Sequence, residues 1–359
     1  MVKNFKKLLV LSSILVLISS TSSYADMNVS RISGRDRYET ALKVQQKYFV
    51  HADGNLAIIA SGKDFRTALY GSYMANALKV PFFVNPTSGL NKSIINELNR
   101  LNVKKVYLMG DVKTLNRNIE NFLLYKKFKT TRFQDKYEDG YLNPIQSYVD
   151  TPIFNTFHYG EPRGDMSNGI IINDKKFPDL LASIPLVSEL ARVQATYLGS
   201  FDGFYINSSD DPRAEGWRFI IGGYATVPSY MGTFPGDKMG LNIHSWDEEN
   251  FDSESIFHTG RIVGQNRYNT AIEIAKAYEP VLNKDINTIV LVDGTNYPDA
   301  LASGTVATFE NGAILLTQPN KLNEDTRDFI EENNIEKVII VGGEKSVSKN
   351  VENELRNLK

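Results

Sequence analysis

The chain has 359 residues, of which 42% are hydrophobic, with a formal net charge of −2 and no cysteine. A chain of this length can bury a large core in two or three domains, and the lack of cysteine excludes a disulfide-stapled scaffold. The nearly neutral balance argues against a nucleic-acid partner or a membrane-surface partner, because both require a strongly basic surface.

The first 25 residues have the pattern of a signal peptide. Three lysines precede an apolar stretch from Leu8 to Ile18, and Ala25 ends a small-residue pattern that fits cleavage before Asp26. The apolar stretch is shorter than the ~20 residues of a membrane-spanning helix. We therefore predict a signal peptide over residues 1–25, rather than an anchor or a buried helix. The secreted remainder would carry a net charge of −5 and would not insert into a membrane.

The rest of the chain contains an internal repeat. The pattern R-I-x-G-x-x-R-Y-x-T-A begins at Arg31 and again at Arg261, and the segments that follow align at a constant offset of 232 residues. A weaker middle copy lacks this opening, of which residues 132–137 are a candidate remnant. In that copy, residues 177–183 match residues 297–303 at an offset of 120 residues. A repeat with so long a constant offset indicates tandem structural units. We predict module 1 over residues 26–130, a degenerate module 2 with long loops over 131–256, and module 3 over 257–359.

The third copy shows the predicted elements most clearly. Short apolar runs that are β-branched alternate with segments of helical spacing, which is typical of a parallel sheet covered on both faces. We therefore predict an α/β fold of three tandem Rossmann-like, doubly wound modules. The predicted strands are Thr288–Val292, Ala313–Leu316 and Lys337–Val341, and the predicted helices are Pro298–Phe309, Glu324–Glu332 and Ser346–Leu358, the last with Ser346 as N-cap.

Two segments between the copies lack clear periodicity. Residues 141–169 are rich in Pro, Gly, Asn and aromatic residues, and residues 234–257 are rich in acids. We interpret both as surface loops or as packing between modules. A partner-binding surface is the alternative, since exposed loops often carry binding residues.

The opening motif, the P-D-A-L-A-S segment at residues 298–303 and the closing V-I-I-V-G-G at residues 338–343 together resemble the type 2 cell-wall-binding repeat. That family occurs in clostridial surface-layer proteins and in autolysin-associated proteins. The resemblance covers nearly the whole chain after residue 25. It implies a pseudo-threefold arrangement of three modules and non-covalent binding to an anionic cell-wall polysaccharide. The copies occupy the chain from Arg31 onward, so we expect no separate effector domain.

Candidate ligand-binding residues follow from the chemistry of such a polymer. Guanidinium groups match phosphate oxygens, and ligands of parallel sheets sit beyond the carboxyl ends of the strands. The family pattern also contains a short strand that here begins with proline. The alternatives are ion pairs between modules for the arginines and a tight turn for the glycines. The predicted binding residues are Arg31, Arg35, Arg37, Lys63, Arg66, Pro81, Arg261, Arg267, Gly342 and Gly343.

Catalytic and metal motifs are not evident. The sequence has no cysteine nucleophile, no H-E-x-x-H and no G-x-S-x-G, and its four histidines lack metal-ligand spacing. Asp179 and Asp299 lie in predicted first helical turns, where a carboxylate is favoured by the helix dipole. We predict a secreted, non-catalytic wall protein without metal or cofactor. The first alternative is a diverged surface protein that binds a protein partner, such as a surface-layer protein. An enzyme acting on wall glycan is the least favoured.

Overall fold

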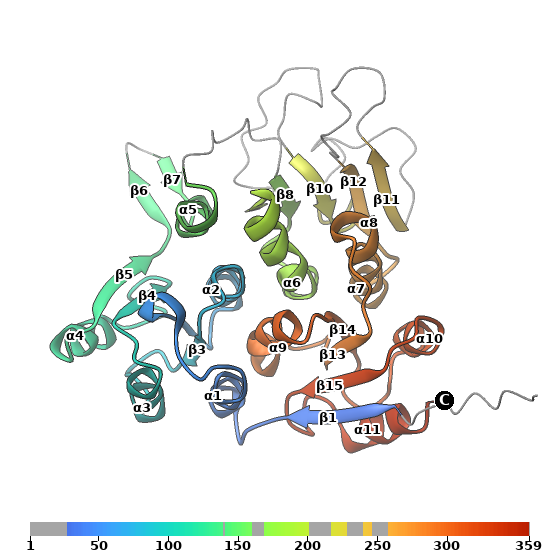
Figure 1. The fold of residues 1–359 in the computed structure, drawn as a ribbon, viewed down its shortest axis with the longest axis horizontal. Coiled ribbons are helices and arrows are strands. Elements are labelled where there is room, and N and C mark those ends of the chain that lie inside the picture. The colour runs from blue at the N-terminus through green and yellow to red at the C-terminus, as the bar shows by residue number, and fades with distance from the viewer. Residues whose placement is uncertain are drawn as a thin grey trace, which may run out of the picture.

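The computed structural model describes residues 27–138, 141–159, 169–200, 217–227, 240–245 and 258–358. The predicted signal peptide and most of segment 234–257 lie outside these residues. The described chain forms three sheets and one small hairpin, with helices between and around them (Figure 1). All paired strands in the three sheets run parallel except β11, which pairs antiparallel with β12. The fold is therefore the predicted α/β arrangement of Rossmann-like modules.

The strands group as follows. The first sheet, in the order β3-β2-β4-β5, contains β2 (Leu56–Ser61), β3 (Phe82–Asn85), β4 (Lys105–Met109) and β5 (Lys129–Phe133). The second, in the order β11-β12-β10-β8-β9, contains β8 (Gly169–Ile172), β9 (Tyr197–Ser200), β10 (Trp217–Ile221), β11 (Gly240–Ser245) and β12 (His258–Val263). The third, in the order β1-β15-β13-β14, contains β1 (Asn28–Ile32), β13 (Thr288–Asp293), β14 (Ala313–Thr317) and β15 (Lys337–Val341). The hairpin joins β6 (Lys136–Glu138) to β7 (Tyr141–Asn143).

Helices flank the first and third sheets on both faces, whereas the described helices beside the second sheet lie on one side of it (Figure 1). Module 1 contributes α1 (Arg37–Tyr48), α2 (Phe65–Leu78), α3 (Lys92–Arg100) and α4 (Arg117–Tyr125), with a short turn η1 (Asp53–Asn55). Module 2 contributes α5 (Gln146–Phe157) and α6 (Phe177–Gln194). Module 3 contributes α7 (Arg267–Lys276), α8 (Tyr278–Leu282), the 3-10 turn η4 (Pro298–Ala302), α9 (Ser303–Phe309), α10 (Glu324–Glu332) and α11 (Lys349–Arg356).

The opening strand of each copy joins the sheet of the preceding module. β5 pairs with β4, and β12 pairs with β10. By the same rule β1, at the start of the chain, pairs in parallel with β15 near its end, with Ser30 opposite Ile339 (Figure 1). The three modules therefore close into a ring, and the first and last modules are joined by hydrogen bonds between their backbones.

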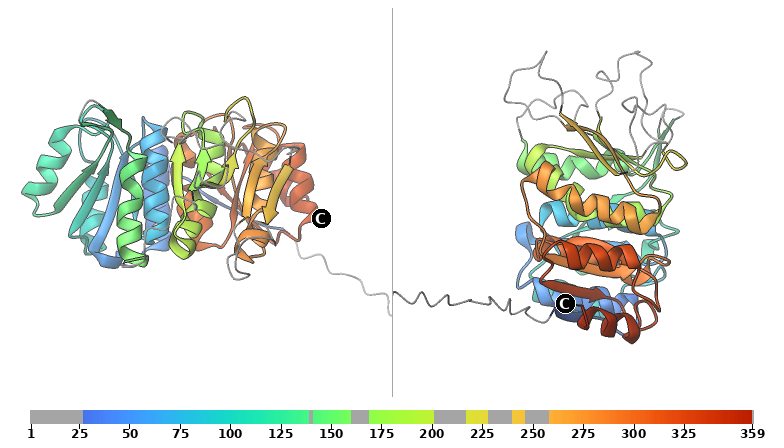
Figure 2. Two further views of the ribbon diagram at one scale, coloured as in Figure 1. Left: turned by 90° about the horizontal axis from the view of Figure 1, so that it is seen from above. Right: turned by 90° about the vertical axis from the view of Figure 1, so that its right-hand side faces the viewer.

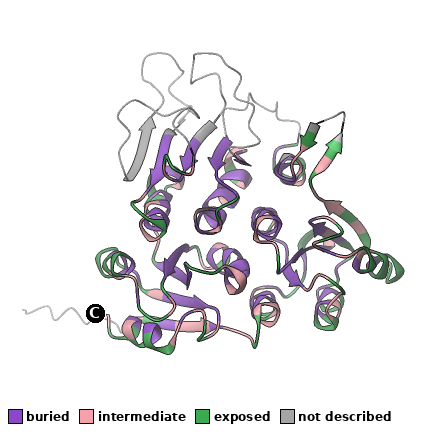
Figure 3. Cartoon of the chain, turned by 180° about the vertical axis from the view of Figure 1, so that it is seen from behind, coloured by how far each residue is buried: buried purple, intermediate pink, exposed green. Residues whose placement is uncertain are grey.

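Three helices fill the centre of the ring. α2 follows β2, α6 follows β8, and α9 follows β13 and the turn η4. The three helices lie side by side (Figures 1 and 2). They are largely buried, whereas the outer helices expose one side (Figure 3). Small residues allow the close approach, because a Cβ placed on Gly304 of α9 would lie 2.5 Å from Asn76 Nδ2 of α2 and 2.9 Å from Ile184 of α6. One continuous apolar core contains residues of all three modules.

Three aromatic rings meet where these helices begin. Phe65, Phe177 and Tyr297 occupy the same position in the three copies, and their ring centroids lie 5.4 to 6.1 Å apart. The middle copy therefore keeps the central packing of the other two, although its opening has diverged.

One prediction about local structure was wrong, and a second was correct only in part. The last helix begins at Lys349 with Ser348 as its N-cap, because the Ser346 hydroxyl donates to Asp299 instead, at 2.6 Å. Within the segment expected to lack periodicity, residues 146–157 form α5, which packs against α2 and α6. The part of that expectation that named packing between modules is confirmed. No helix in the described part of the chain is long and apolar enough to cross a membrane.

Candidate functional site

The carboxyl ends of the strands gather on one face of the ring, which we call the strand-end face. It consists of segments 61–64, 173–176 and 293–296, at the ends of β2, β8 and β13, and of the turns after Gly110, Gly222 and Gly342. The three aromatic rings lie among these segments. In parallel sheets this is the edge at which ligands bind. The sites predicted from the sequence fall on this face or directly behind it, with the exception of Pro81. Pro81 precedes β3 and therefore lies at the amino ends of the strands, away from the predicted ligand site.

The first arginine of each opening motif holds the neighbouring turn. Arg31 donates to the carbonyl of Gly342 at 2.8 Å, and Arg261 donates to that of Gly222 at 2.7 Å. Arg132 makes the same bond to Gly110 at 2.8 Å, so residues 132–137 are a remnant of the opening in structure as well as in sequence. The three glycines have φ between 109° and 127°, a region that favours residues without a Cβ. The arginine and the glycine therefore form one structural unit that joins consecutive modules.

Further partners surround these strand arginines. Arg31 donates two hydrogen bonds to Glu352 at 3.1 Å, and Arg132 pairs with Glu120 at 3.0 Å. Burial alone would raise the pKa of Glu352, but hydrogen bonds from neighbouring cations, Arg31 among them, lower it to about 2. Arg261 is fully buried over the ring of Tyr224, with 4.2 Å between guanidinium and centroid. These contacts favour the ion-pairing alternative that the sequence left open for Arg31, whereas Arg261 is held by the backbone carbonyls of Gly222 and Val227.

The second arginine of each motif lies closer to solvent. Arg37 donates to the carbonyl of Gly62 at 2.7 Å, and Arg267 donates to that of Gly294 at 2.6 Å. A Cβ on either glycine would lie 2.8 Å from the ring of the tyrosine that follows the arginine, so glycine is required there. Among the described residues neither guanidinium has another hydrogen-bond partner, so each keeps unused donors. Arg267 also acts on Asp179: burial raises the pKa of that carboxyl, and the charge of Arg267 opposes the rise. Arg37 is half-buried and Arg267 is exposed.

Arg35 and Lys63 add exposed charge in module 1. Arg35 is 91% exposed and pairs with Glu39 at 2.6 Å. The Lys63 side chain is exposed, and its backbone carbonyl accepts a hydrogen bond from the Tyr297 hydroxyl at 3.0 Å, across the boundary with module 3. Arg35 lies two residues before Arg37, and Lys63 directly follows Gly62, whose carbonyl Arg37 binds.

The remaining predicted residues belong to the backbone framework. Pro81 is buried, and its carbonyl accepts a hydrogen bond from the amide of Ile58. Gly342 carries the carbonyl that Arg31 binds, and the Gly343 amide lies 3.4 Å from the Asp299 carboxylate. The tight turn accounts for Gly342, whose φ is 127°, whereas a Cβ on Gly343 would meet no atom within 4 Å. Asp299 ties this turn to the start of η4 through Ser346 and Gly343, a role that differs from the predicted interaction with the helix dipole.

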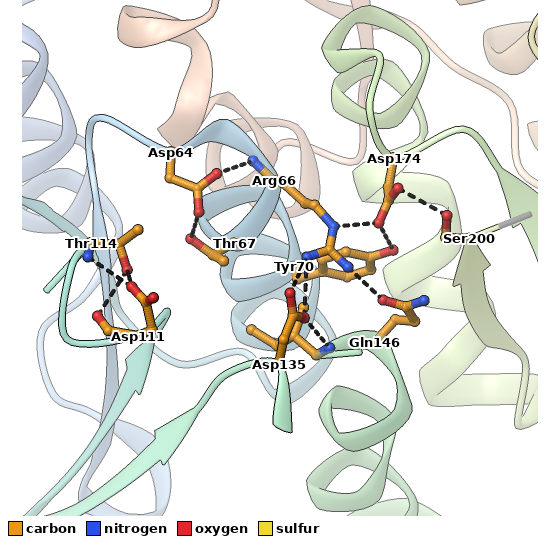
Figure 4. Close-up of polar contacts among 11 residues, drawn as sticks. Asp64, Arg66, Thr67, Tyr70, Asp111, Thr114, Asp135, Gln146, Asp174 and Ser200 are labelled. Carbon is orange, nitrogen blue, oxygen red and sulfur yellow. Dashed lines mark hydrogen bonds and ion pairs between the residues drawn. The ribbon is translucent and has the colours of Figure 1, made fainter. Parts of the chain in front are cut away.

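Arg66 is the centre of a polar cluster between modules 1 and 2 (Figure 4). Its Nε donates to Asp174 at 2.6 Å, and its other nitrogens donate to Asp135 at 3.1 Å and to Gln146 at 2.9 Å. Asp174 is almost fully buried and also accepts from Tyr70 and Ser200, at 3.1 and 2.9 Å. Burial disfavours the guanidinium charge, but Asp174 outweighs that effect and raises the pKa of Arg66 above its ordinary value.

This cluster explains why module 1 has an arginine, and module 2 two aspartates, at positions where the other copies have different residues. Asp174 stands where modules 1 and 3 have Gly62 and Gly294, and Asp135 stands where they have Gly34 and Gly264. Module 2 inserts the β6–β7 hairpin before its helix α5, so the tight turn that requires glycine is absent there. Arg66 of module 1, which replaces the proline of the other copies, neutralises both acids. The sequence signal was the joint presence of an unusual arginine and two unusual acids.

The chemistry of the strand-end face is that of an anion-binding surface. Modules 1 and 3 present Arg37 and Arg267 with unused donors, and module 1 adds Arg35 and Lys63. Arg66, the additional cation of module 1 at the boundary with module 2, is occupied by carboxylates. Within the described ranges no group of three or more histidine or acidic side chains could hold a metal ion.

Comparison with known proteins identifies the family. The model of cell wall binding domain 2 (CWB2) matches residues 31–120 and 261–352, which together make up half of the chain. The protein belongs to this family. The matched ranges are the first and third copies, which are the copies that keep Arg37 and Arg267. The middle copy, outside the matched ranges, shares the sheet, the central helix and the aromatic position of the other two.

Several whole proteins are similar to the chain. The N-acetylmuramoyl-L-alanine amidase LytC of Bacillus subtilis is 21% identical over 99% of this chain and 63% of its own length. The amidase enhancer of the same organism is 30% identical over 34% of this chain and 17% of its own. Among solved structures, Cwp6 of Clostridium difficile matches with a TM-score of 0.68 and 17% identity, over 94% of this chain and 50% of its own. Cwp8 of the same organism matches with a TM-score of 0.63 and 15% identity, over 93% and 52%. These solved structures support the fold, and the chain spans between a sixth and two thirds of the length of its relatives.

Proposed function

We propose that the protein attaches non-covalently, and without catalysis, to an anionic secondary polysaccharide of a Gram-positive cell wall. Membership of the cell wall binding domain 2 family supports binding to the wall. The predicted signal peptide over residues 1–25 would bring the protein to the cell surface. Other surface-layer proteins are the second class of partner.

The observation that carries the proposal is the hydrogen bonding of Arg37 and Arg267. Each uses one nitrogen to hold the backbone of a strand-end loop and has no other hydrogen-bond partner among the described residues. A guanidinium fixed in this way loses little further freedom when it binds, and its fork matches phosphate or carboxylate oxygens. Because the protein has a net negative charge, binding to an anion depends on such local cations.

The test is retention by purified walls. The protein from residue 26 onward is mixed with intact walls and with walls stripped of anionic polymer, over a series of salt concentrations. We expect retention by intact walls only, weakening as salt rises because charged contacts are screened. Equal retention by both wall preparations would contradict the proposal.

A pair of double variants locates the binding face. Arg37→Gln with Arg267→Gln should lower wall affinity roughly tenfold or more, because two charge-assisted contacts are lost. The control, Lys104→Gln with Lys105→Gln, removes the same charge from exposed residues at the opposite end of β4 and should leave retention unchanged. Equal losses in both would assign binding to overall charge instead.

A second candidate function is binding of a protein partner, which module 2 favours. Two exposed apolar residues lie opposite each other in its hairpin, Tyr137 (75% exposed) and Leu142 (60% exposed), and Tyr159, 88% exposed, follows α5. Exposed aromatic and aliphatic side chains that lie close together are typical of interaction surfaces. Failure to bind either wall preparation, together with capture of a purified surface-layer protein that Tyr137→Ser abolishes, would support this function in place of the first.

A further inference from the structure

β5 leaves one side of the first sheet open. It pairs in parallel with β4 on its inner side, and Figure 1 shows it at the outer margin of the ring. The Lys129 amide donates to the carbonyl of Lys104 at 2.9 Å, toward β4. Because the backbone groups of successive strand residues point to opposite sides, those of Thr130 and Arg132 point away from β4. Neither of these two amides has a hydrogen-bond partner among the described residues. We call this outward row of backbone groups the β5 edge.

The second sheet shows how such an edge can be completed. β12 is the strand equivalent to β5, since Arg261 of β12 and Arg132 of β5 bind the glycine turns in the same way. The outer side of β12 is covered by β11, which pairs antiparallel with it along its full length. A strand of another molecule placed likewise on β5 would bond to the backbone of Thr130 and Arg132. Addition of a strand to an open edge is a general mode of peptide recognition.

The surface beside β5 is apolar where the equivalent surface beside β1 is polar. α4 packs against β5 as α11 packs against β1, and a glutamate of each helix pairs with the strand arginine. Three side chains near the end of α4 are 40%, 49% and 74% exposed, namely Phe122, Leu124 and Tyr125. At the constant offset of 232 residues, module 3 has Glu354, Arg356 and Asn357. The exposed apolar side chains are therefore not required by the fold.

The charge of the same surface is uniformly positive. Exposed lysines lie at or just before the first residues of β4 and β5, namely Lys104, Lys105, Lys126, Lys127 and Lys129. The two segments that carry them, residues 101–107 and 121–131, contain no acidic residue. Lysines on an open edge hinder pairing with a second copy of the same edge, because like charges would meet. A segment that carries carboxylates complements them.

We propose that the β5 edge binds an extended, acidic segment of a partner protein by addition of a strand. The backbone of the segment would pair with Thr130 and Arg132, its carboxylates would face the lysines, and its apolar side chains would pack on the exposed residues of α4. The lysines lie at the amino ends of the strands, opposite the strand-end face. The inference therefore does not depend on the proposed polymer binding.

Titration with three synthetic peptides tests the proposal on the protein from residue 26 onward. The first alternates glutamate and valine over seven residues, the second has lysine in place of glutamate, and the third is the acidic peptide with every internal amide N-methylated. Each is added up to about 1 mM. We expect saturable binding of the acidic peptide with a Kd of about 0.1 mM or lower, and binding at least tenfold weaker for the other two. Equal binding of the N-methylated peptide, or binding of none, would overturn the proposal.

Hydrogen exchange of single amides, followed by NMR, reports on the strand pairing itself. With the acidic peptide bound, the amides of Thr130 and Arg132 should exchange more slowly, because they become hydrogen-bonded. The amide of Thr131, which points toward β4, should exchange at an unchanged rate. Binding without slower exchange at Thr130 and Arg132 would reduce the site to a charged patch and overturn the proposal.

Two variants alter the edge and the apolar surface separately. Thr130→Pro removes an outward amide without removing a bond to β4, a position at which edge strands tolerate proline, and should weaken binding of the acidic peptide about tenfold. The triple variant Phe122→Glu, Leu124→Arg, Tyr125→Asn gives α4 the residues of α11 at unchanged net charge and should weaken it about fivefold. Val193→Ser, at an exposed apolar residue of α6, is the control and should leave binding unchanged.

The unfolding midpoint and retention by intact walls should stay the same in these variants, so this inference and wall binding can fail independently. Unchanged peptide affinity in both the proline and the triple variant would overturn the proposal. A dimer of the free protein that Thr130→Pro dissociates, measured by sedimentation, would assign the edge to a second copy and would also overturn it.

Discussion

At the scale of single residues, this protein uses cations mainly to hold its modules together. The strand arginines bind backbone carbonyls and carboxylates of the neighbouring module, and Arg66 binds two carboxylates of module 2. Buried charges of this kind are costly when one partner is removed, because the other is left unpaired away from water. Arginine therefore stabilises the contacts between modules at some positions and keeps unused hydrogen-bond donors at others.

Substitution of Arg66 should reveal this structural role. Arg66→Met is expected to lower the free energy of unfolding by about 3 kcal/mol, since it leaves the buried Asp174 without its cation. Adding Asp174→Asn should restore part of the loss. Urea unfolding measures both, with Arg35→Met at an exposed site as the control that should leave stability unchanged. A loss no greater than that of the control would contradict the role.

A buried carboxyl should make stability depend on pH. Asp150 of α5 is buried and accepts a hydrogen bond from Tyr73 at 2.5 Å, and burial raises its pKa from 3.8 to about 7. Between these values the folded protein holds a proton that the unfolded chain has released. The stability from this group is therefore complete below the lower value and is lost as pH rises through the upper one.

We expect the free energy of unfolding to fall by roughly 1 kcal/mol per pH unit between about pH 5 and about pH 7 because of this carboxyl. Asp150→Asn should remove that slope, whereas Asp53→Asn at an exposed site should keep it. Denaturant unfolding at a series of pH values measures the slope, and an equal slope in both variants would contradict the assignment.

At the scale of elements, exchange of the opening strand joins the modules. β1, β5 and β12 each lie in the sheet of the module before them. For β1 this partner lies at the far end of the chain, so the sheet of module 3 is complete only when the first strand is in place. Each sheet therefore contains strands from two copies of the repeat, and the boundaries read from the sequence do not coincide with the boundaries of the sheets.

Removal of β1 should therefore destabilise module 3. A protein that begins at Gly34 loses the backbone pairing with β15 and the Arg31–Glu352 ion pair. We expect a lower unfolding midpoint and faster hydrogen exchange of the β15 amides than in a protein that begins at Asn28. Unchanged exchange in β15 would show that the strand is not needed.

At the scale of the whole molecule, the modules share one core. The central helices and the rings of Phe65, Phe177 and Tyr297 belong to three modules, and the main apolar cluster runs through all of them. Burial of apolar surface is the principal stabilising effect, and most of it here requires neighbouring modules to be present. The ring is thus the folding unit.

Heating should accordingly give one cooperative transition. We expect the calorimetric and van't Hoff enthalpies of unfolding to agree, as they do for a two-state protein. A fragment of residues 26–133 should not fold alone, because α2 would expose the side that it buries against α6. Separate transitions for the modules, or a folded fragment, would contradict this expectation.

The repeat and the alternation of strands and helices could be read from the sequence because they depend on local patterns. The run Thr288–Val292 is apolar at every position after Thr288, and the helix predicted over Glu324–Glu332 agrees with α10 residue for residue. α5 could not be predicted in this way, since Pro152 lies within it and its stability comes from packing against α2 and α6. The start of α11 was misplaced because Ser346 has a distant partner in Asp299.

The amino-acid sequence by itself determined the family, the α/β class and the copies in which the arginine-tyrosine pair persists. Only the tertiary structure decided that Arg31 and Arg261 are bound by neighbouring modules while Arg37 and Arg267 keep free donors, and that Arg66 belongs with Asp174. The reason is physical. A periodic pattern records the environment of a residue along its own strand or helix, whereas a hydrogen bond between Arg31 and Glu352 spans 321 residues and exists only after the ring has closed.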